Sequence, residues 1–364
     1  MLSQHLHQET IRLEDQSIPA QEFEYAKTEI AQKSDFHAQL CELISVWISD
    51  SPNLIINTSG STSSNPKQIT APKEKILNSV RYTQNFFDLK EGDTTLLCLP
   101  LGYVAGTMMV IRSLVIGMDL YVRPPCGRPL EDKSLPDITY GAMTPLQVFN
   151  ALSIPDERKK LREIQNLMIV GGSVNIQMEE TLRTLPNNIC STYGMAETLS
   201  HIAMRRISGE NASDVYTPFH NVHLSLSKDD TLIIDAPLVR EEPFTTNDLA
   251  EIYDDHRFKI LGRLDNVVNS GGIKISIDLV ERLLQPAIHG MFAITSMHDE
   301  KFGEALILVS EVSVDEQKVK EALPSKYYIP RKILTVDKIP LTPTEKINRK
   351  KLKNLAYQKL SGSA

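Results

Sequence analysis

The sequence of 364 residues has little cysteine, a single tryptophan and no long apolar run that is free of charge. Its four cysteines, Cys41, Cys98, Cys126 and Cys190, are far apart and form no CxxC pair. This usage disfavours a disulfide framework and a zinc site, and it is typical of a protein from a reducing compartment.

Positive charge is also in short supply. The chain carries 39 Lys and Arg against 46 Asp and Glu, which gives a net charge of -7. This balance disfavours nucleic acid or an anionic membrane as the main partner, although a local basic pocket for a small anion remains possible.

Targeting and membrane signals are absent from the sequence. The first residues lack the apolar segment of a signal peptide. The most apolar long stretch, residues 106–122, contains Arg112, Gly117 and Asp119. It therefore predicts a buried helix followed by a strand and no membrane span. We expect a cytoplasmic protein.

The body of the chain has the pattern of an α/β protein. A helical pattern covers residues 104–115, and the segment 223–235 alternates around a Lys-Asp-Asp turn, which predicts a β-hairpin. Short apolar runs that predict buried strands occur at residues 95–101, 119–122, 138–143 and 166–172. Strands that alternate with helices predict a parallel sheet covered by helices, here with a small β element attached.

The last hundred residues predict a separate small α+β domain. Helical patterns cover residues 277–284 and 315–323, and strand patterns cover residues 291–298, 304–311 and 332–336. We therefore predict a large domain over residues 1–264 and a small one over residues 265–364, a normal domain size. The boundary is expected near Gly262–Asp265.

Four polar segments carry the candidate chemistry, and the first is residues 57–67. It follows a predicted strand end, contains six hydroxyl side chains, and includes Gly60 and Lys67. Successive amides, hydroxyls and a lysine can wrap a polyphosphate, but a flexible serine-rich linker fits the segment about equally well. The segment lacks GxxxxGK[ST], so a P-loop kinase or GTPase is disfavoured.

The other three segments are also weak when each is taken alone. In residues 191–198, Tyr193 offers a ring for adenine and Glu197 a ligand for magnesium, yet a surface turn explains them as well. Residues 262–274 contain two adjacent glycines that suit a plain turn. Residues 340–349 present Lys346 on a loop stiffened by two prolines, although a lysine near a C-terminus is usually solvated.

The order and spacing of these segments resemble those of the adenylate-forming superfamily, which includes acyl-CoA synthetases, luciferases and peptide-synthetase adenylation domains. The resemblance runs from about Asn57 to Leu355 and covers most of the chain. It implies a large N-terminal domain that binds ATP and an acid, and a small mobile C-terminal domain that carries a catalytic lysine. The implied reaction uses ATP and Mg²⁺ to form an acyl-adenylate, which coenzyme A then converts to a thioester.

The resemblance also implies roles for individual residues. Lys346 resembles the catalytic lysine that bridges carboxylate and α-phosphate, Glu197 the magnesium-binding glutamate, and Asp265 the hinge. The residues that resemble the phosphate loop are Thr58, Ser59, Gly60, Ser61, Thr62 and Lys67. Those that resemble the remaining nucleotide, acyl and coenzyme A contacts are Gly171, Gly172, Ser173, Tyr193, Gly194, Asp248, Arg263, Gly271 and Gly272.

Several positions depart from the usual pattern of the superfamily. The phosphate loop is one residue longer and lacks its second glycine, and Ala196 replaces a threonine. Asn247 and Glu345 each replace a glycine. The region before the phosphate loop is shorter than usual, so a reduced first subdomain is expected. These departures keep open a non-catalytic nucleotide-binding relative.

Within the superfamily, residues 99–122 resemble the o-succinylbenzoate–CoA ligases of menaquinone biosynthesis. Arg112 matches an arginine of that group, and Tyr103 stands where many members have histidine. An arginine in an apolar helix can bind the second carboxylate of a dicarboxylic acid, although pairing with a structural acid is the alternative. Another acyl- or aryl-CoA ligase remains open, while a peptide-synthetase adenylation domain is less favoured because no carrier domain follows.

Overall fold

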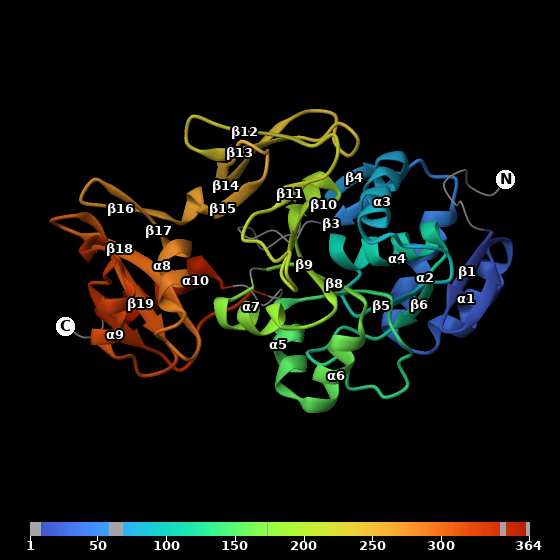
Figure 1. Cartoon of the computed structure of the whole chain (residues 1–364), viewed down its shortest axis with the longest axis horizontal. Helices are drawn as coiled ribbons and strands as arrows, with labels where there is room; N and C mark the ends of the chain where they lie inside the picture. The colour runs from blue at the N-terminus through green and yellow to red at the C-terminus, as the bar shows by residue number, and fades with distance from the viewer. Residues whose placement is uncertain (1–8, 58–67, 173, 343–346, 362–364) are drawn as a thin grey trace. The chain divides into compact units, whose positions relative to one another are not determined.

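The computed structural model describes residues 9–57, 68–172, 174–342 and 347–361. It forms two compact units, drawn together in Figure 1. The first comprises Met1–Val174, Thr181–His223 and Asp235–Pro243, and the second comprises Asn175–Glu180, Leu224–Ile234 and Phe244–Ala364. The predicted boundary between residues 264 and 265 is a hinge about which one domain moves. A single structure does not test such a motion, so this boundary stays a prediction.

A nine-stranded sheet forms the centre of the first unit, in the order β11-β10-β9-β8-β7-β5-β6-β1-β2. The strands from β1 to β9 in this order run parallel, and β2, β10 and β11 are antiparallel additions at the two edges. The strands are β1 (Thr10–Leu13), β2 (Gln16–Pro19), β5 (Thr94–Leu97), β6 (Asp119–Val122), β7 (Tyr140–Met143), β8 (Asn166–Ile169), β9 (Asn188–Met195), β10 (Ser200–Arg206) and β11 (Thr217–Pro218). The predicted parallel sheet is therefore confirmed.

Helices cover this sheet, and Figure 1 shows α3 beside α4 over it, with α5 and α6 elsewhere on the same unit. A separate antiparallel hairpin pairs β3 (Asn53–Asn57) with β4 (Gln68–Pro72). The helices are η1 (Ala20–Glu22), α1 (Phe23–Ala31), α2 (Asp35–Ile48), α3 (Lys73–Phe87), α4 (Val104–Ile116), α5 (Pro145–Ser153), α6 (Pro155–Glu163) and η2 (Ala196–Thr198). Helix α7 (Ile176–Arg183) has residues in both units.

Helix α4 is the most enclosed of the described helices, because every residue from Gly106 to Ile116 is buried. Most of its side chains are apolar, as expected for a helix surrounded by protein, and Arg112 is its charged exception. It ends at Gly117, which adopts a left-handed conformation with φ 81° and leads into β6. The sequence predicted this buried helix and the following strand, and both are confirmed. Among the described residues, no helix is long and apolar enough to cross a membrane.

The second unit contains two sheets. One is a four-stranded sheet of β12 (His223–Leu226), β13 (Thr231–Asp235), β14 (Phe244–Ile252) and β15 (Phe258–Arg263). The predicted hairpin at residues 223–235 corresponds to its strands β12 and β13. The other sheet contains β16 (Val267–Ser270), β17 (Ile273–Ser276), β18 (Phe292–Asp299), β19 (Gly303–Ser310) and β20 (Lys332–Thr335).

Helices pack against the second sheet, and the side chains between them form an apolar core. Val280 and Leu284 of α8 (Ile277–Leu284) are fully buried against Ile294 and Leu308 of the sheet. Leu352 of α10 (Arg349–Ser361) belongs to a second cluster of buried side chains. The remaining elements are η3 (Leu264–Asn266), α9 (Glu316–Ala322), η4 (Lys326–Tyr328) and α10 (Arg349–Ser361). The five helical and strand segments predicted after residue 265 are confirmed, with ends that differ by at most one residue.

Candidate functional site

The carboxyl ends of four parallel strands bring the first group of predicted residues to one edge of the sheet. Strands β5, β7, β8 and β9 are neighbours and run in the same direction. The segments that follow β5 and β8 contain Tyr103 and Gly171–Gly172, and β9 leads through Tyr193 to Glu197. Ligands of open α/β sheets bind outside the carboxyl ends of the strands. This edge is therefore the candidate site of the first unit.

Gly171 and Gly172 form the turn directly after β8. Both are exposed, and a Cβ atom on Gly171 would meet nothing within 4 Å. A Cβ atom on Gly172 would lie 3.4 Å from the ring of Pro145, at the start of α5. The turn thus leaves a strip of backbone open, as a ligand that packs flat against the chain would need.

The segment Tyr193–Glu197 turns sharply into the antiparallel strand β10. Gly194 is required here, because a Cβ atom would collide with the backbone of Ser200 and His201. Thr198 fixes the turn, since its hydroxyl accepts a hydrogen bond from Met195 N (3.0 Å) and donates to Ser200 O (2.7 Å). Tyr193 is partly exposed, and its ring lies 5.9 Å from that of Tyr216.

The turn after Glu197 is strained. Leu199 has φ 55° and Ser200 has φ 143°, values that residues with a Cβ atom rarely adopt. Such strain persists only where the surrounding structure enforces it, and it is concentrated at functional sites. Glu197 itself is exposed within η2. One exposed carboxylate suits Mg²⁺, which commonly takes one or two carboxylates and completes its shell with substrate phosphates and water.

No cluster of three or more His, Cys, Asp or Glu side chains that would hold a metal ion is found in residues 9–57, 68–172, 174–342 and 347–361. The magnesium role of Glu197 therefore depends on phosphate oxygens from the substrate, and it stays a prediction.

Arg112 is placed on α4 and only 1% of it is exposed. Its Nε donates to Thr83 Oγ1 of α3 at 2.9 Å, and its Nη2 donates to Ser200 Oγ at 2.8 Å. Burial lowers the pKa of Arg112, and the nearby phenol of Tyr140 opposes this shift. Burial in turn raises the pKa of Tyr140 to about 12. Tyr140 is the titratable group that acts on Arg112, and no carboxylate does so among the residues the structure describes.

Tyr103 occupies the position before α4. It is the N-cap residue of that helix, with φ -130° and ψ 157°, and its side chain is partly exposed. Its backbone carbonyl accepts a hydrogen bond from Thr107 N. Tyr103 thus precedes the first turn of the helix that carries Arg112, nine positions before it, and the substrate role of Tyr103 stays a prediction.

The second unit carries the predicted ribose contacts. Asp248 on β14 and Arg263 on β15 are direct partners across the antiparallel pair. Arg263 Nη2 also lies 3.1 Å from Asp265 Oδ2, and Asn247 Nδ2 donates to the same oxygen at 3.3 Å. The strand pair therefore brings Asp248 and Arg263 together, and Arg263 lies two residues before the predicted hinge residue Asp265.

The segment after Arg263 is tied to α8 and α10. Asp278 Oδ2 accepts from Arg263 N at 2.9 Å, and Asn266 Nδ2 contacts both carboxylate oxygens of Asp278. Arg349 lies 3.3 Å from Asp278 and contacts both oxygens of Glu281 at 2.5 Å and 2.7 Å. A continuous polar network therefore links the hinge segment to the residue three positions after Lys346.

Gly271 and Gly272 form the turn of the β16–β17 hairpin. Gly271 has φ 61°, and a Cβ atom on it would lie 2.8 Å from Phe302. That ring packs under Arg331, whose guanidinium is 4.2 Å from its centre. Glycine is thus needed for this turn on structural grounds, and contact with coenzyme A stays a prediction.

Several predicted residues lie outside the described residues: Thr58, Ser59, Gly60, Ser61, Thr62, Lys67, Ser173 and Lys346. Their flanks are described. Asn57 and Gln68 are paired at the loop end of the β3–β4 hairpin, so the predicted phosphate segment is the connection between its two strands. Leu341 and Ile347 flank the segment that contains Lys346, and they pair in an isolated antiparallel bridge.

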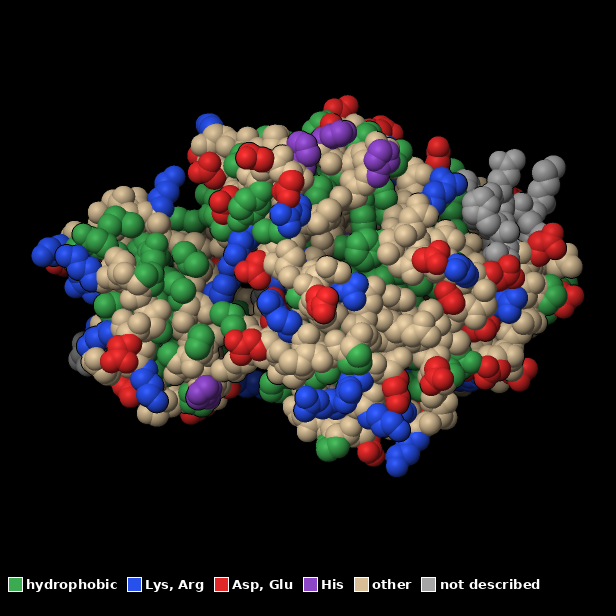
Figure 2. All heavy atoms as spheres, in the orientation of Figure 1, with side chains coloured by type: hydrophobic (Ala, Val, Ile, Leu, Met, Phe, Trp, Pro, Cys, Tyr) green, Lys and Arg blue, Asp and Glu red, His purple; other side chains and the backbone are tan. Residues whose placement is uncertain are grey.

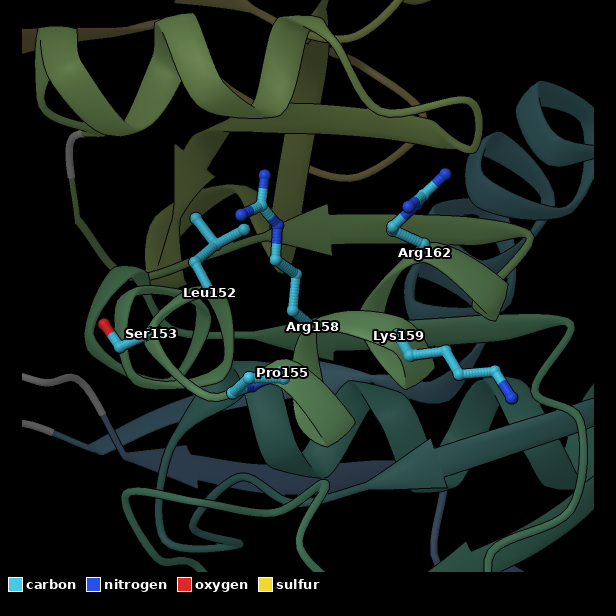
Figure 3. A pocket seen from close by; sticks show the side chains of 6 residues that line it. All are labelled: Leu152, Ser153, Pro155, Arg158, Lys159 and Arg162. Atoms are coloured by element: carbon cyan, nitrogen blue, oxygen red, sulfur yellow. The ribbon is translucent and has the colours of Figure 1, made fainter.

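A surface hollow at the junction of α5 and α6 contains none of the predicted residues. Its lining consists of Leu152, Ser153, Pro155, Arg158, Lys159 and Arg162. Figure 2 shows lysine and arginine side chains gathered over this part of the first unit, and Figure 3 shows the three basic side chains around the turn. Solvated basic side chains explain this surface without a ligand.

Sequence analysis missed Thr83, Ser200 and His201. Thr83 Oγ1 lies 3.0 Å from His201 Nε2, and Ser200 Oγ lies 3.2 Å from His201 Nδ1. Each stands in an ordinary pattern: Thr83 within an amphipathic helix, Ser200 and His201 at a strand start. The only available signal was the proximity of Ser200 and His201 to the segment that contains Glu197.

The chain is similar to proteins of known families. The family described as AMP-binding enzyme matches residues 3–236. A 2-succinylbenzoate–CoA ligase of Escherichia coli (strain K12) is 27% identical over 316 residues, which cover 81% of this chain and 67% of that protein.

Two solved structures extend this likeness. An acyl-CoA synthetase (AMP-forming)/AMP-acid ligase II-like protein of Dyadobacter fermentans is 28% identical, with a TM-score of 0.61 over 90% of this chain and 95% of that chain. An O-succinylbenzoate coenzyme A synthetase of Bacillus subtilis, in complex with ATP and magnesium ion, is 20% identical, with a TM-score of 0.69 over 82% of this chain and 69% of that chain. The latter likeness concerns the fold.

Proposed function

The chain belongs to the AMP-binding enzyme family, and on that premise we propose that it is an AMP-forming acid–CoA ligase that acts on o-succinylbenzoate. The ligase activity is supported by the curated and structural relatives, and the acid is supported by the surroundings of Arg112. ATP, Mg²⁺ and coenzyme A are the expected co-reactants.

The observation that carries the choice of acid is a buried arginine without an acidic partner among the described residues. Removing a charged group from water costs several kcal/mol, so a buried arginine is normally paired with a carboxylate. Arg112 instead contacts two hydroxyls and lies near a phenol whose pKa burial raises to about 12. A carboxylate supplied by the substrate would complete this environment, and o-succinylbenzoate has one carboxylate to spare.

The proposed reaction has two steps. In the first, an oxygen of the acid's other carboxylate bonds to the α-phosphorus of ATP while the bond to pyrophosphate breaks. All the reacting groups are negative, so the ammonium of Lys346 would offset the charge that develops. Glu197 would hold Mg²⁺, which screens the phosphates when bound. In the second step the thiol of coenzyme A attacks the acyl carbon, loses its proton and displaces AMP.

Pyrophosphate release by the purified protein tests this function. The protein would be supplied with ATP, Mg²⁺, coenzyme A and a panel of acids that includes o-succinylbenzoate, and the thioester would be identified by mass spectrometry. We expect release that depends on o-succinylbenzoate. Turnover of a different acid would keep the ligase activity and reject the substrate. Binding of ATP without turnover of any acid would support a non-catalytic relative instead.

A further inference from the structure

An unusual polar group surrounds Arg112 in the first unit. Thr83 comes from α3, Arg112 from α4, and Ser200 and His201 from the start of β10. Thr83, Arg112 and His201 are at most 4% exposed and Ser200 is 9% exposed. Four polar side chains from three elements thus meet in the interior, and none of them is an acid.

Their contacts close a ring. Arg112 donates from Nε to Thr83 Oγ1 (2.9 Å) and from Nη2 to Ser200 Oγ (2.8 Å). The imidazole of His201 then contacts both hydroxyls, Thr83 through Nε2 (3.0 Å) and Ser200 through Nδ1 (3.2 Å). Each hydroxyl therefore bridges the guanidinium and the imidazole.

The imidazole of His201 contributes one hydrogen-bond donor and one acceptor to the ring. A guanidinium only donates hydrogen bonds, so both hydroxyls must accept from Arg112. A neutral imidazole has one donor and one acceptor nitrogen. It can therefore donate to one of the two hydroxyls and accept from the other. Burial, followed by the charge of Arg112, holds the pKa of His201 well below its ordinary value of 6.5. His201 thus completes the ring without adding or removing charge.

The ring fixes the guanidinium but leaves its charge uncompensated. The bonds to Thr83 and Ser200 use Nε and one hydrogen of Nη2, and the guanidinium also hydrogen-bonds the phenol of Tyr140. A guanidinium has five N–H donors in one plane, so these contacts do not use all of them. Holding one edge of that plane orients the remaining donors. A carboxylate at position 83, 200 or 201 would neutralise the charge of Arg112. The uncharged side chains of Thr83, Ser200 and His201 leave that charge in place.

We infer that Thr83, Ser200 and His201 are positioning residues that hold Arg112 for the second carboxylate of the acid, and so select dicarboxylic over monocarboxylic acids. This inference rests on the proposed function and deepens it. His201 and Thr83 act through the arginine. Their loss leaves the charge in place but frees the guanidinium to rotate, which weakens bidentate binding of a carboxylate.

A matched pair of variants at Thr83 tests the inference. Thr83→Val keeps the shape of the side chain and removes the hydroxyl, whereas Thr83→Ser keeps the hydroxyl. Ser79→Ala is the control, because Ser79 is a buried serine of the same helix whose hydroxyl contacts Leu199 O and not Arg112. Circular dichroism and thermal unfolding would establish that each variant is folded.

The quantity to measure is a selectivity ratio. It compares kcat/KM for o-succinylbenzoate with kcat/KM for β-benzoylpropionate, which lacks the ring carboxylate. If β-benzoylpropionate is not turned over, its inhibition constant takes the place of its kcat/KM. Thr83→Val should lower the ratio about tenfold, mainly by raising KM for the dicarboxylate, while KM for ATP stays unchanged. Thr83→Ser and Ser79→Ala should retain the wild-type ratio. Ser200→Ala should lower the selectivity ratio in the same way. It therefore tests the inference even if Thr83→Val does not fold.

The outcomes separate the two proposals. If the wild-type protein turns over o-succinylbenzoate and both Thr83→Val and Ser200→Ala keep its ratio, the positioning role is wrong and the ligase function stands. A loss that affects both acids equally would indicate a purely structural ring and would also reject the inference. If the wild-type protein prefers the monocarboxylate, the proposed substrate and the positioning role both fall.

Discussion

Asp248 and Arg263 face each other across the β14–β15 pair, directly opposite in register. Directly opposed residues of an antiparallel pair have Cβ atoms about 5 Å apart and point to the same side of the sheet. Fifteen residues separate the two in sequence, yet the strand pairing brings them together. The superfamily resemblance assigns both to the ribose, and this pairing supports a joint role.

The first prediction concerns this pair. Asp248→Asn and Arg263→Ala should each raise KM for ATP about tenfold, because each removes a charged hydrogen-bonding group from the expected ribose contacts. The double variant should lose less than the sum of the two losses, since opposed residues are coupled. Steady-state kinetics with varied ATP would measure this. Strictly additive losses would show that the two residues act independently.

The second prediction concerns magnesium. Glu197→Gln removes the negative charge but retains the size of an exposed side chain at the end of β9. The Mg²⁺ concentration that supports half-maximal pyrophosphate release should rise about tenfold or more, as expected on loss of a metal ligand. Glu210→Gln, another exposed glutamate of the same unit, is the control. An unaltered Mg²⁺ titration in Glu197→Gln would refute the assigned role.

The third prediction separates the two half-reactions. Lys346→Ala should slow adenylation at least about a hundredfold, because a charge that stabilises the transition state is lost. Thioester formation from supplied acyl-adenylate should be retained. Lys350→Ala, an exposed lysine four residues later, should leave both steps unchanged. If adenylation by Lys346→Ala remains at the wild-type rate, another residue supplies that charge.

The fourth prediction concerns acid stability. Burial and Arg112 hold the pKa of His201 well below 6.5 in the folded protein, whereas the unfolded chain takes up a proton near that value. The unfolded state therefore binds more protons below pH 6.5, and the free energy of unfolding falls as the pH decreases through that value. His201→Phe should flatten this dependence in urea unfolding between about pH 8 and pH 5. An identical slope in the variant would show that other groups cause the acid loss.

The fifth prediction concerns the network around Arg349. Arg349→Met keeps the apolar stem but removes the contacts with Glu281 and Asp278, and it leaves two carboxylates without this cationic partner. The free energy of unfolding should fall by about 1–3 kcal/mol. Lys353→Met, which removes an exposed pair with Glu304, should cost less. Equal losses in the two variants would mean that the partial burial of Arg349 adds nothing.

The sequence by itself determined those elements whose cause is local. The apolar segment before Gly117 predicted helix α4, and the segment 277–284 predicted α8 with its observed ends. Side-chain periodicity and turn residues act over a few positions, so they can be read without a structure. The order of the polar segments likewise pointed to the AMP-binding family, which the match over residues 3–236 confirms.

The roles of Lys346 and of the phosphate segment stay predictions, since both lie outside the described residues. For Arg112, the sequence left two readings open, a structural acid or a second substrate carboxylate. Thr83 lies 29 positions before it and Ser200 lies 88 positions after it. Only the packing of α3, α4 and β10 decided that these uncharged groups surround the arginine, because no local pattern encodes which distant side chains share a buried space.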